Sequence, residues 1–415
     1  MHSILTFFGF RRPANTPPTP AQVEVNIRYL VLDIAWFGVL IGTTINFLQV
    51  YVVRLGASSL LVSAVTYGPA LVNIFWQLPA AQLMGRTGHR MRWTVRAGLL
   101  YRLFYLLVAL VPFLTTVGRA EWTVLLLVLL AFPMSISSVG FLSVLADAVP
   151  ADRIAQVVGW RMAALGLTST LSTLLAGRVL QWLPFPFNYQ LLFIVGFIGS
   201  LGSSWYVASL HVPDRPPEKS EPGHWLHEIH RIRRYPGFVR FAFIVGILQL
   251  AIGMMTPLLP LFWVRRLDAT DGQISIIVTV ASATMVLGSL LMRRMVGRIG
   301  RGRALAAGAL GFGLYPLLTS FTTSAWWLIP WAALGGFFNA VVAVTLFDNL
   351  VANSPENDRA NFIAIFNLFV NAALFFGPLI GGFLARGSDG RLGLQVATGI
   401  AFVAGLLFAV RARAR

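Results

Sequence analysis

The sequence contains no cysteine, a single lysine (Lys219) and few acidic residues, with 15 Asp and Glu against 32 Lys and Arg. A chain without cysteine has no disulfide framework, no thiolate nucleophile and no cysteine-ligated metal or iron–sulfur site. Charged residues of either sign make up only 11% of the chain, whereas soluble domains contain about 25%. These absences argue against a soluble redox enzyme and against a secreted domain held together by disulfides.

Motifs for catalysis and nucleotide binding are also absent. The sequence has no GxxxxGK[ST] phosphate-binding loop, no HExxH metal-binding helix and no GxSxG nucleophile elbow. We therefore expect no ATP hydrolysis, no enzyme activity, and no cofactor or metal ion. The alternative left open is a membrane-embedded enzyme whose serine or carboxylate groups lie on separate helices. The net charge is +17, but the arginines fall in short loops, so we expect no nucleic-acid partner.

Long apolar runs make up most of the chain. Hydrophobic residues account for 57% of it, and the mean hydropathy is +0.74. A helix needs about 20 apolar residues to cross the hydrocarbon core of a bilayer. Twelve segments meet this requirement, so the sequence predicts an all-α membrane protein with twelve transmembrane helices. The expected spans are 29–52, 58–84, 94–117, 122–148, 155–181, 187–211, 238–264, 272–297, 304–323, 326–352, 360–384 and 392–411.

The distribution of basic residues indicates how these spans are oriented. With the amino terminus in the cytoplasm, seven of the 32 Lys and Arg fall in external loops, Arg102 lies within the third span, and the rest are cytoplasmic. Cytoplasmic loops of membrane proteins carry an excess of Lys and Arg. We therefore expect a multi-pass protein of the cell membrane with both termini in the cytoplasm. The seven external residues are Arg54, Arg119, Arg178, Arg265, Arg266, Arg386 and Arg391.

The segments outside the spans suggest four parts. Residues 1–27 lack the basic region and cleavage site of a signal peptide and contain a Pro-rich stretch, which predicts a disordered cytoplasmic tail. Residues 28–211 and 238–415 are each expected to form a bundle of six helices. The longest interhelical segment, 212–237, is expected to be a cytoplasmic linker between the two bundles.

The linker contains the sequence HWLHEIHRIRRY, in which apolar and basic residues recur at helical spacing. Trp225 and Ile229 fall on one face of such a helix, and His227 and Arg231 fall on the opposite face. We expect a short amphipathic helix that binds anionic lipid headgroups. The histidines lack the i, i+4 pair of a zinc-binding helix, which favours this surface helix over a metal site.

The two halves of the chain resemble each other. A shift of 212 residues aligns Arg28 with Arg240, and it aligns YVVRLGAS at 51–58 with WVRRLDAT at 263–270. No gap is needed across the first two spans or the loop that follows them. Two six-helix units related without inversion are the plan of a transporter whose substrate path runs between its halves.

The loops after the second and eighth spans read AAQLMGRTGHRMR and MRRMVGRIGRGRA. They resemble the cytoplasmic loop of the major facilitator superfamily, which reads Gly-x-x-x-Asp-Arg-x-Gly-Arg-[Arg/Lys]. With the helix count, linker and repeat, the resemblance covers nearly the whole chain after residue 25. It implies two pseudo-symmetric six-helix bundles, a small-molecule solute as partner, and a monomer. The matching residues, which the resemblance assigns to a cytoplasmic gate, are Arg86, Gly88, Arg90, Arg298, Gly300 and Arg301.

Two positions of the motif depart from the family pattern in both halves. Gly85 and Gly297 stand where the family usually has Asp, and Ala81 and Arg293 stand where it usually has the first Gly. The Asp of the family helps to latch the cytoplasmic gate, so that latch does not carry over to this chain. The glycines still permit a tight turn between helices, and the arginines can hold the loop at phosphate headgroups.

The ends of the fourth and tenth spans carry a second resemblance to the family, in LADAVPADR and LFDNLVANSPENDR. Family members often have an acidic residue there, followed by Pro and Arg, in ion pairs that break as the halves rock. The resemblance therefore implies gate pairs of Asp147 with Arg153 and of Asp348 with Arg359. Ordinary charges at the headgroup interface are the alternative interpretation.

Three ionisable residues stand out inside the spans, because a charge at mid-bilayer costs at least about 2.5 kcal/mol. Asp33 and Arg161 lie about 6 Å and 9 Å from the cytoplasmic starts of the first and fifth spans, at 1.5 Å per residue. Because these helices are neighbours in the family fold, the two residues are predicted to form a buried ion pair. The alternatives are that Asp33 couples transport to a proton gradient, or that the dipole of its own helix stabilises its carboxylate. Arg102 is expected to reach the cytoplasmic interface.

Polar side chains within the spans are the candidates for a substrate path. An amide in hydrocarbon needs a hydrogen-bond partner, so these residues are expected to face the bundle interior or a wet cavity. Each is as compatible with helix–helix contact as with substrate binding. The candidates are Thr44, Asn46, Gln49, Asn73, Gln77, Gln249, Thr256, Asn339, Asn367 and Asn371.

Together these features predict a secondary transporter that moves a small solute by alternating access, with proton coupling through Asp33 as an open possibility. A lipid scramblase with the same fold is the main alternative, and a permease subunit for a separate ATPase is another. The scarcity of fixed charges disfavours a multiply charged solute. The sequence does not distinguish uptake from efflux, or symport from antiport.

Overall fold

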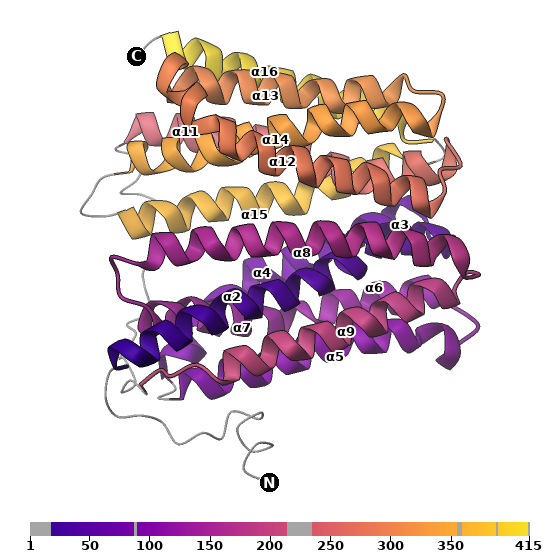
Figure 1. Cartoon of the computed structure of the whole chain (residues 1–415). Helices are drawn as coiled ribbons and strands as arrows, with labels where there is room; N and C mark the ends of the chain where they lie inside the picture. Colours follow the sequence, from indigo (N-terminus) through magenta and orange to yellow (C-terminus); the bar gives the residue numbers. More distant parts are fainter. Residues whose placement is uncertain (1–17, 87–88, 214–234, 355–358, 387–388, 414–415) are drawn as a thin grey trace. The chain divides into compact units, whose positions relative to one another are not determined.

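The computed structural model describes residues 18–86, 89–213, 235–354, 359–386 and 389–413, and these residues form helices joined by short turns (Figure 1). The predicted amphipathic helix of the linker and the first 17 residues lie outside this range. The helices are α2 (Pro20–Thr43), η1 (Ile45–Phe47), α3 (Leu48–Arg54), α4 (Ser59–Arg86), α5 (Arg90–Leu114), α6 (Arg119–Leu129), α7 (Ala131–Ala148), α8 (Ile154–Trp182), α9 (Phe187–Ala208), α11 (Pro236–Arg265), α12 (Asp271–Ile299), α13 (Arg301–Ser320), η2 (Ala325–Trp327), α14 (Leu328–Asn353), α15 (Arg359–Leu384) and α16 (Arg391–Arg413).

Eleven helical segments of the described chain are long and apolar enough to cross a membrane. The all-α membrane fold that the sequence predicts is therefore present. The expected ninth span, which corresponds to α13, is not among the eleven. This helix has 20 residues, begins with Arg301 and Arg303, and contains four glycines, which lower its apolar content.

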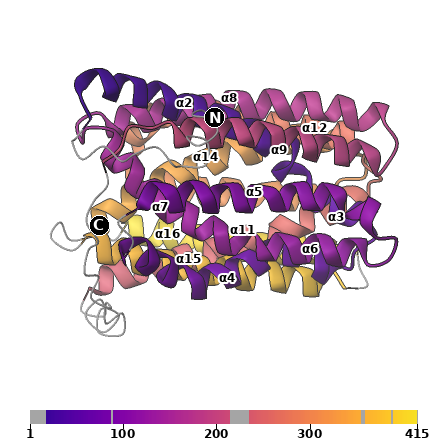
Figure 2. The ribbon, with the colours of Figure 1, turned by 90° about the horizontal axis from the view of Figure 1, so that it is seen from below.

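The described helices pack as two compact units, which contain residues 1–48 with 72–222, and 49–71 with 223–415. In the first unit, α2 lies against α8 and α9, and α5 lies against α7 and α9 (Figures 1 and 2). In the second unit, α13 packs between α14 and α16, and α11 packs against α15 and α16. Helix α3 and the first half of α4 belong to the second unit, although they precede most of the first unit in sequence.

The first helix starts earlier than the sequence suggested. Residues 20–27 were expected in a disordered tail, but α2 begins at Pro20. The Thr19 side chain accepts from the backbone N–H of Gln22, and the Gln22 side chain accepts from the backbone N–H of Thr19, which is a complete capping box. Pro20 at the first helical position adds a preset backbone angle. The Pro-rich composition therefore masked a helix start.

Two of the expected spans are interrupted. The fourth consists of α6 and α7, which are separated at Leu130. Pro133 lies in the first turn of α7 and has no N–H to donate to the carbonyl group of Leu129, so the helix restarts there. The first span also breaks, because the turn at Thr44 and the short helix η1 separate α2 from α3.

Candidate functional site

The first unit contains a buried polar network that joins three helices. Asp33 of α2 forms an ion pair with Arg161 of α8, with 3.0 Å between Oδ2 and Nη1. Each of these side chains is 6% exposed. Ser203 of α9 donates to the other carboxylate oxygen of Asp33 at 2.6 Å. Arg161 also donates to the carbonyl group of Leu30, so both charges have polar partners on neighbouring helices.

Arg102 of α5 extends this network. Its Nη2 donates to the Ser203 hydroxyl at 2.8 Å, and its Nη1 donates to the carbonyl oxygen of Gly98 at 3.0 Å. The guanidinium group also lies over the rings of Tyr101 and Phe37, at 4.7 Å and 5.9 Å from their centroids. Arg102 is 6% exposed, so it does not reach the interface as the sequence had suggested. It is held inside the bundle by hydrogen bonds and aromatic contacts.

A cavity of about 420 Å³ lies beside the network, within the first unit. The charged residues that line it are Asp33, Arg102 and Arg161. Much of the remaining wall is apolar, and the ring of Phe141 lies 4.7 Å from the guanidinium carbon of Arg161. Along α7 the lining residues Met134, Ser138 and Leu142 are exposed, and they recur at four-residue spacing on one face of the helix. The cavity is therefore lined in part by an exposed face of α7.

Four of the predicted path residues lie in hydrogen bonds or close packing between elements. Asn46 donates to Thr173 of α8 at 3.0 Å, and Gln49 donates to Thr66 of α4 at 2.8 Å. Asn73 accepts from Ser135 of α7. Thr44 is fully buried, and its hydroxyl lies 3.4 Å from that of Thr43. These contacts fit the helix–helix alternative.

The other predicted path residues are more accessible. Gln77 and Asn367 are exposed, and Gln249, Thr256, Asn339 and Asn371 are half-buried. The Thr256 hydroxyl donates to its own helix at Ile252, and the Asn339 amide lies 3.9 Å from the sulfur atom of Met285. None of the ten path candidates lines the cavity beside Asp33, or a second cavity around Gly300 and Arg301, among the residues that the structure describes.

The predicted gate residues of the first half lie at the ends of their helices. Arg86 is exposed at the end of α4, and Arg90 donates to Ser143 of α7 at 3.0 Å. Arg153 pairs with Glu24 of α2, whereas the sequence suggested Asp147 as its partner. The early start of α2 brings Glu24 to the turn before α8, which explains the different partner. Gly88 lies outside the described residues.

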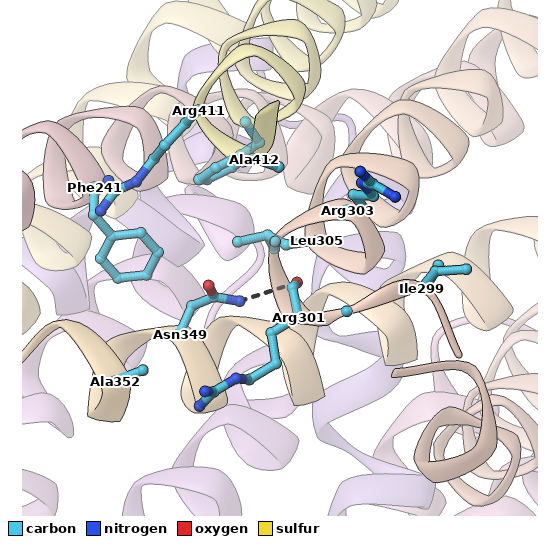
Figure 3. Close-up of a pocket in the computed structure, with 12 residues that line it drawn as sticks. Phe241, Ile299, Arg301, Arg303, Leu305, Asn349, Ala352, Arg411 and Ala412 are labelled. Carbon is cyan, nitrogen blue, oxygen red and sulfur yellow. Dashed lines mark hydrogen bonds between the residues drawn. The ribbon is translucent and has the colours of Figure 1, made fainter. Parts of the chain in front are cut away.

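Two of the predicted gate residues of the second half, Gly300 and Arg301, line a second cavity, of about 320 Å³ (Figure 3). Gly300 joins α12 to α13 with φ of +81°, a conformation that favours glycine, as the tight turn predicts. Arg301 begins α13, and its carbonyl oxygen accepts from Asn349 of α14 at 3.2 Å. Arg303 and Arg411 also line the cavity. Among the other predicted gate residues, Arg298 is exposed, Asp348 is half-buried, and the side chain of Arg359 lies outside the described range.

The loop that follows α3 is latched to the loop that follows α11, within the second unit. Arg54 forms an ion pair with Asp271 at 3.0 Å and donates to the carbonyl oxygen of Ala269 at 2.6 Å. In return, Arg265 donates to the carbonyl group of Ala57. These are the two loops that the internal repeat aligns, and both turn through a positive φ, at Gly56 (+82°) and Asp268 (+47°). The sequence repeat predicts their likeness but not their contact.

Sequence reasoning also missed two polar residues of the first unit. Ser203 bridges Asp33 and Arg102, and a serine in an apolar helix carries no distinctive signal. Asn26, fully buried in α2, donates to the carbonyl oxygens of Ala148 and His211 and accepts from the His211 N–H. An amide on an otherwise apolar helical face was the available signal, and it was hidden by assigning residue 26 to the tail.

The family model of the Major Facilitator Superfamily matches residues 29–262 and 241–415, which together span nearly the whole described chain. The chain belongs to the Major Facilitator Superfamily. The mouse (Mus musculus) MFS-type transporter SLC18B1 is 22% identical over 260 residues, which cover 59% of this chain. The match spans about half of that relative's length, 54%.

Solved structures of other transporters share the fold. A mutant of the nucleoside transporter NupG superposes with a TM-score of 0.72 at 14% identity, covering 93% of this chain and 99% of that one. A mutant of the peptide transporter POT, in complex with sulfate, gives 0.72 at 13% identity, with 96% and 97% covered. A bacterial homologue of the human lysosomal transporter Spinster, inward-facing and occupied, gives 0.71 at 13% identity, with 95% and 98% covered.

The family and the fold make this MFS protein a multi-pass membrane protein of a transporter family rather than an enzyme. They do not extend to the identity of the solute, because structural likeness at 13–14% identity shows the fold alone.

Proposed function

We propose that this protein is a secondary transporter of the cell membrane that carries its solute by alternating access. The observation that carries the proposal is the latch between the loops after α3 and α11, formed by Arg54, Asp271 and the backbone. The latch joins the two equivalent turns of a duplicated chain, and on the proposed topology both turns are external. On this proposal, the contact between the turns forms in one of the two states that alternating access requires and is absent from the other.

The latch is suited to breaking and re-forming. The side chains of Arg54 and Asp271 are 28% and 13% exposed, so the ion pair is reachable by water and is stabilised only modestly. A fully buried pair would cost several kcal/mol to separate. An ion pair that is partly exposed to water allows the free energies of the two states to lie within a few kcal/mol of each other. Both states can then be populated, as a working transporter requires.

The proposed topology follows the positive-inside bias, with both termini in the cytoplasm. In that orientation the cavity lined by Arg301, Arg303 and Arg411 opens near the cytoplasmic headgroups, and its charges favour contact with anionic lipid. The transporter is proposed to act as a monomer, because each chain carries both repeated halves.

The proposal is tested with purified protein in liposomes. A thermal-shift screen of small solutes first selects stabilising compounds, and their uptake is then measured with and without a pH gradient or a membrane potential. We expect accumulation above the outside concentration that collapses when an ionophore dissipates the gradient. Protein-free liposomes are the control. Movement of fluorescent lipid between leaflets without any gradient, and no solute uptake, would instead support the scramblase alternative.

A further inference from the structure

The charges that line the cavity of the first unit do not balance. Two arginines, Arg102 and Arg161, face one carboxylate, that of Asp33, which leaves a net charge of +1 within the membrane-spanning region. An ionisable residue at this depth is costly unless it is paired, and such residues usually mark a functional site. The excess positive charge therefore calls for an anion.

Arg102 forms no direct ion pair among the described side chains and reaches the Asp33 carboxylate only through the Ser203 hydroxyl. The Asp33 carboxylate is occupied by Arg161 and Ser203, whereas the hydrogen bonds of Arg102 go to a serine hydroxyl and a backbone carbonyl group. Its Nε is buried and has no hydrogen-bond acceptor among the residues that the structure describes. Aromatic faces at Tyr101 and Phe37 compensate only part of the desolvation of a guanidinium group.

The rest of the cavity favours an organic anion over a bare ion. Its volume of about 420 Å³ falls in the range of small-molecule sites, about 300 to 1,000 Å³. The walls are mainly apolar and aromatic, and the charged groups gather at the Asp33, Arg102 and Arg161 network. A solute with one anionic group and an apolar body matches both features.

We propose that the cavity of the first unit binds a monoanionic, amphipathic solute, a carboxylate with an apolar or aromatic body, with Arg102 as the main ligand of its anionic group. The carboxylate completes a set of two cations and two anions, and the body lies against Phe37, Tyr101 and Phe141. The claim that this solute is transported rests on the proposed function. The claim that the cavity binds this class of solute does not.

The test measures binding to the purified full-length protein by calorimetry, with three probes that share one body: 4-phenylbutyrate, 4-phenylbutyramide and 4-phenylbutylamine. We expect the carboxylate to bind at least about tenfold more tightly than the amide or the amine. Equal binding of the three probes, or a preference for the amine, would overturn the inference.

Sodium chloride and sodium sulfate are titrated at matched ionic strength. If chloride displaces the carboxylate at equal concentration, the cavity is a site for inorganic anions. That result would overturn the proposal that it binds an organic carboxylate.

Variants locate the site. Arg102→Gln should weaken carboxylate binding about tenfold or more, and Asp33→Asn should strengthen it, because it removes the competing negative charge. The matched control is Arg178→Gln, which removes an exposed arginine from the far end of α8 and should leave binding unchanged. The same direction of change for Arg102→Gln and Asp33→Asn would contradict the assignment. The wild-type preference among the three probes remains decisive if a variant does not fold.

The outcomes separate this inference from the proposed function. Tight carboxylate binding without uptake in liposomes would refute transport of this solute but leave the site in place. Uptake of a neutral or cationic solute, with no carboxylate preference in binding, would refute the inference while the transporter stands.

Discussion

Asp33 and Arg161 depend on each other for their burial. Each is almost fully removed from water, and each satisfies part of the other's hydrogen-bonding capacity across 3.0 Å. Ser203 and the Leu30 carbonyl group supply further partners. Removing one member of a buried pair leaves the other charge without compensation, which typically costs about 3 to 5 kcal/mol. The pair therefore constrains how α2 and α8 pack.

This dependence predicts a non-additive effect on stability. Asp33→Asn and Arg161→Gln should each lower the melting temperature of the purified protein in detergent, by an amount that corresponds to about 3 kcal/mol. The double variant should lose clearly less than the sum of the two, because neither charge is then left alone. Arg178→Gln on α8 serves as the control for the loss of an arginine. Strict additivity would mean that the two residues do not form a pair in the folded protein.

The same variants separate the two roles that the sequence left open for Asp33. A structural pair predicts that a pH gradient stimulates uptake by the double variant, once folded, by the same factor as uptake by the wild type, even where solute affinity changes. Loss of gradient-driven uptake, with the fold and binding intact, would instead assign proton coupling to Asp33. We expect the response to the gradient to be retained, because the Asp33 carboxylate is committed to Arg161 and Ser203.

At the scale of single residues, the sequence predicts which charged side chains are buried better than it predicts the residues that they contact. The similar depths of Asp33 and Arg161 from the same membrane face, with the resemblance to a family in which the first and fifth helices are neighbours, indicated a pair. The role of Arg102 could not be predicted, since it depends on Ser203, a residue on another helix, 101 positions away. Helix rotation decides whether a long arginine side chain turns inward or reaches the interface, and a single sequence does not fix that rotation.

Close contact between α12 and α14 depends on Gly336 of α14. A methyl group added at this position would lie 2.1 Å from the carbonyl oxygen of Ala281, a backbone atom that cannot move aside. Small residues allow helices in membranes to approach each other in this way, because lipid provides no hydrophobic drive for their association. Neighbouring Gly335 is similarly restricted by the ring of Tyr315 of α13.

A matched pair of substitutions tests this packing. Gly336→Ala should force the two helices apart and lower the melting temperature, with a cost of about 1 to 3 kcal/mol. Gly399→Ala in α16 makes the same chemical change where no atom lies within 4 Å of the added methyl group. It should be neutral, or stabilising by up to about 1 kcal/mol through higher helix propensity. Equal effects at the two positions would show that the contact is not tight.

The elements themselves were largely predictable, and their interruptions were less so. Apolar length is a strong signal, and most expected spans correspond to helices within a few residues. The break before α7 could have been inferred from Pro133, which lies inside an apolar run. The start of α2 at Pro20 was signalled by Thr19 and Gln22, but the neighbouring prolines suggested a tail.

On the scale of the whole molecule, duplication is the main organising feature. The sequence repeat predicted two related halves, and the aligned turns at Gly56 and Asp268 share an unusual positive φ. The contact between these turns could not be predicted, because it depends on side-chain and backbone groups that are more than 200 residues apart in the sequence. On the proposed function, the ion pair of Arg54 with Asp271 belongs to one of the two transport states.

The central claim, alternating access controlled by the external latch, is tested most directly by distance measurements between pairs of spin labels. The chain has no native cysteine, so pairs introduced at Val117 with Ser324 and at Asp152 with Ala352 can be labelled specifically. On the proposed topology the first pair is external and the second is cytoplasmic.

The perturbation is the double variant Arg54→Gln/Asp271→Asn, and Arg178→Gln is the control. We predict that loss of the latch lengthens the external distance and shortens the cytoplasmic one. Unchanged distances, or two pairs that lengthen together, would contradict the account.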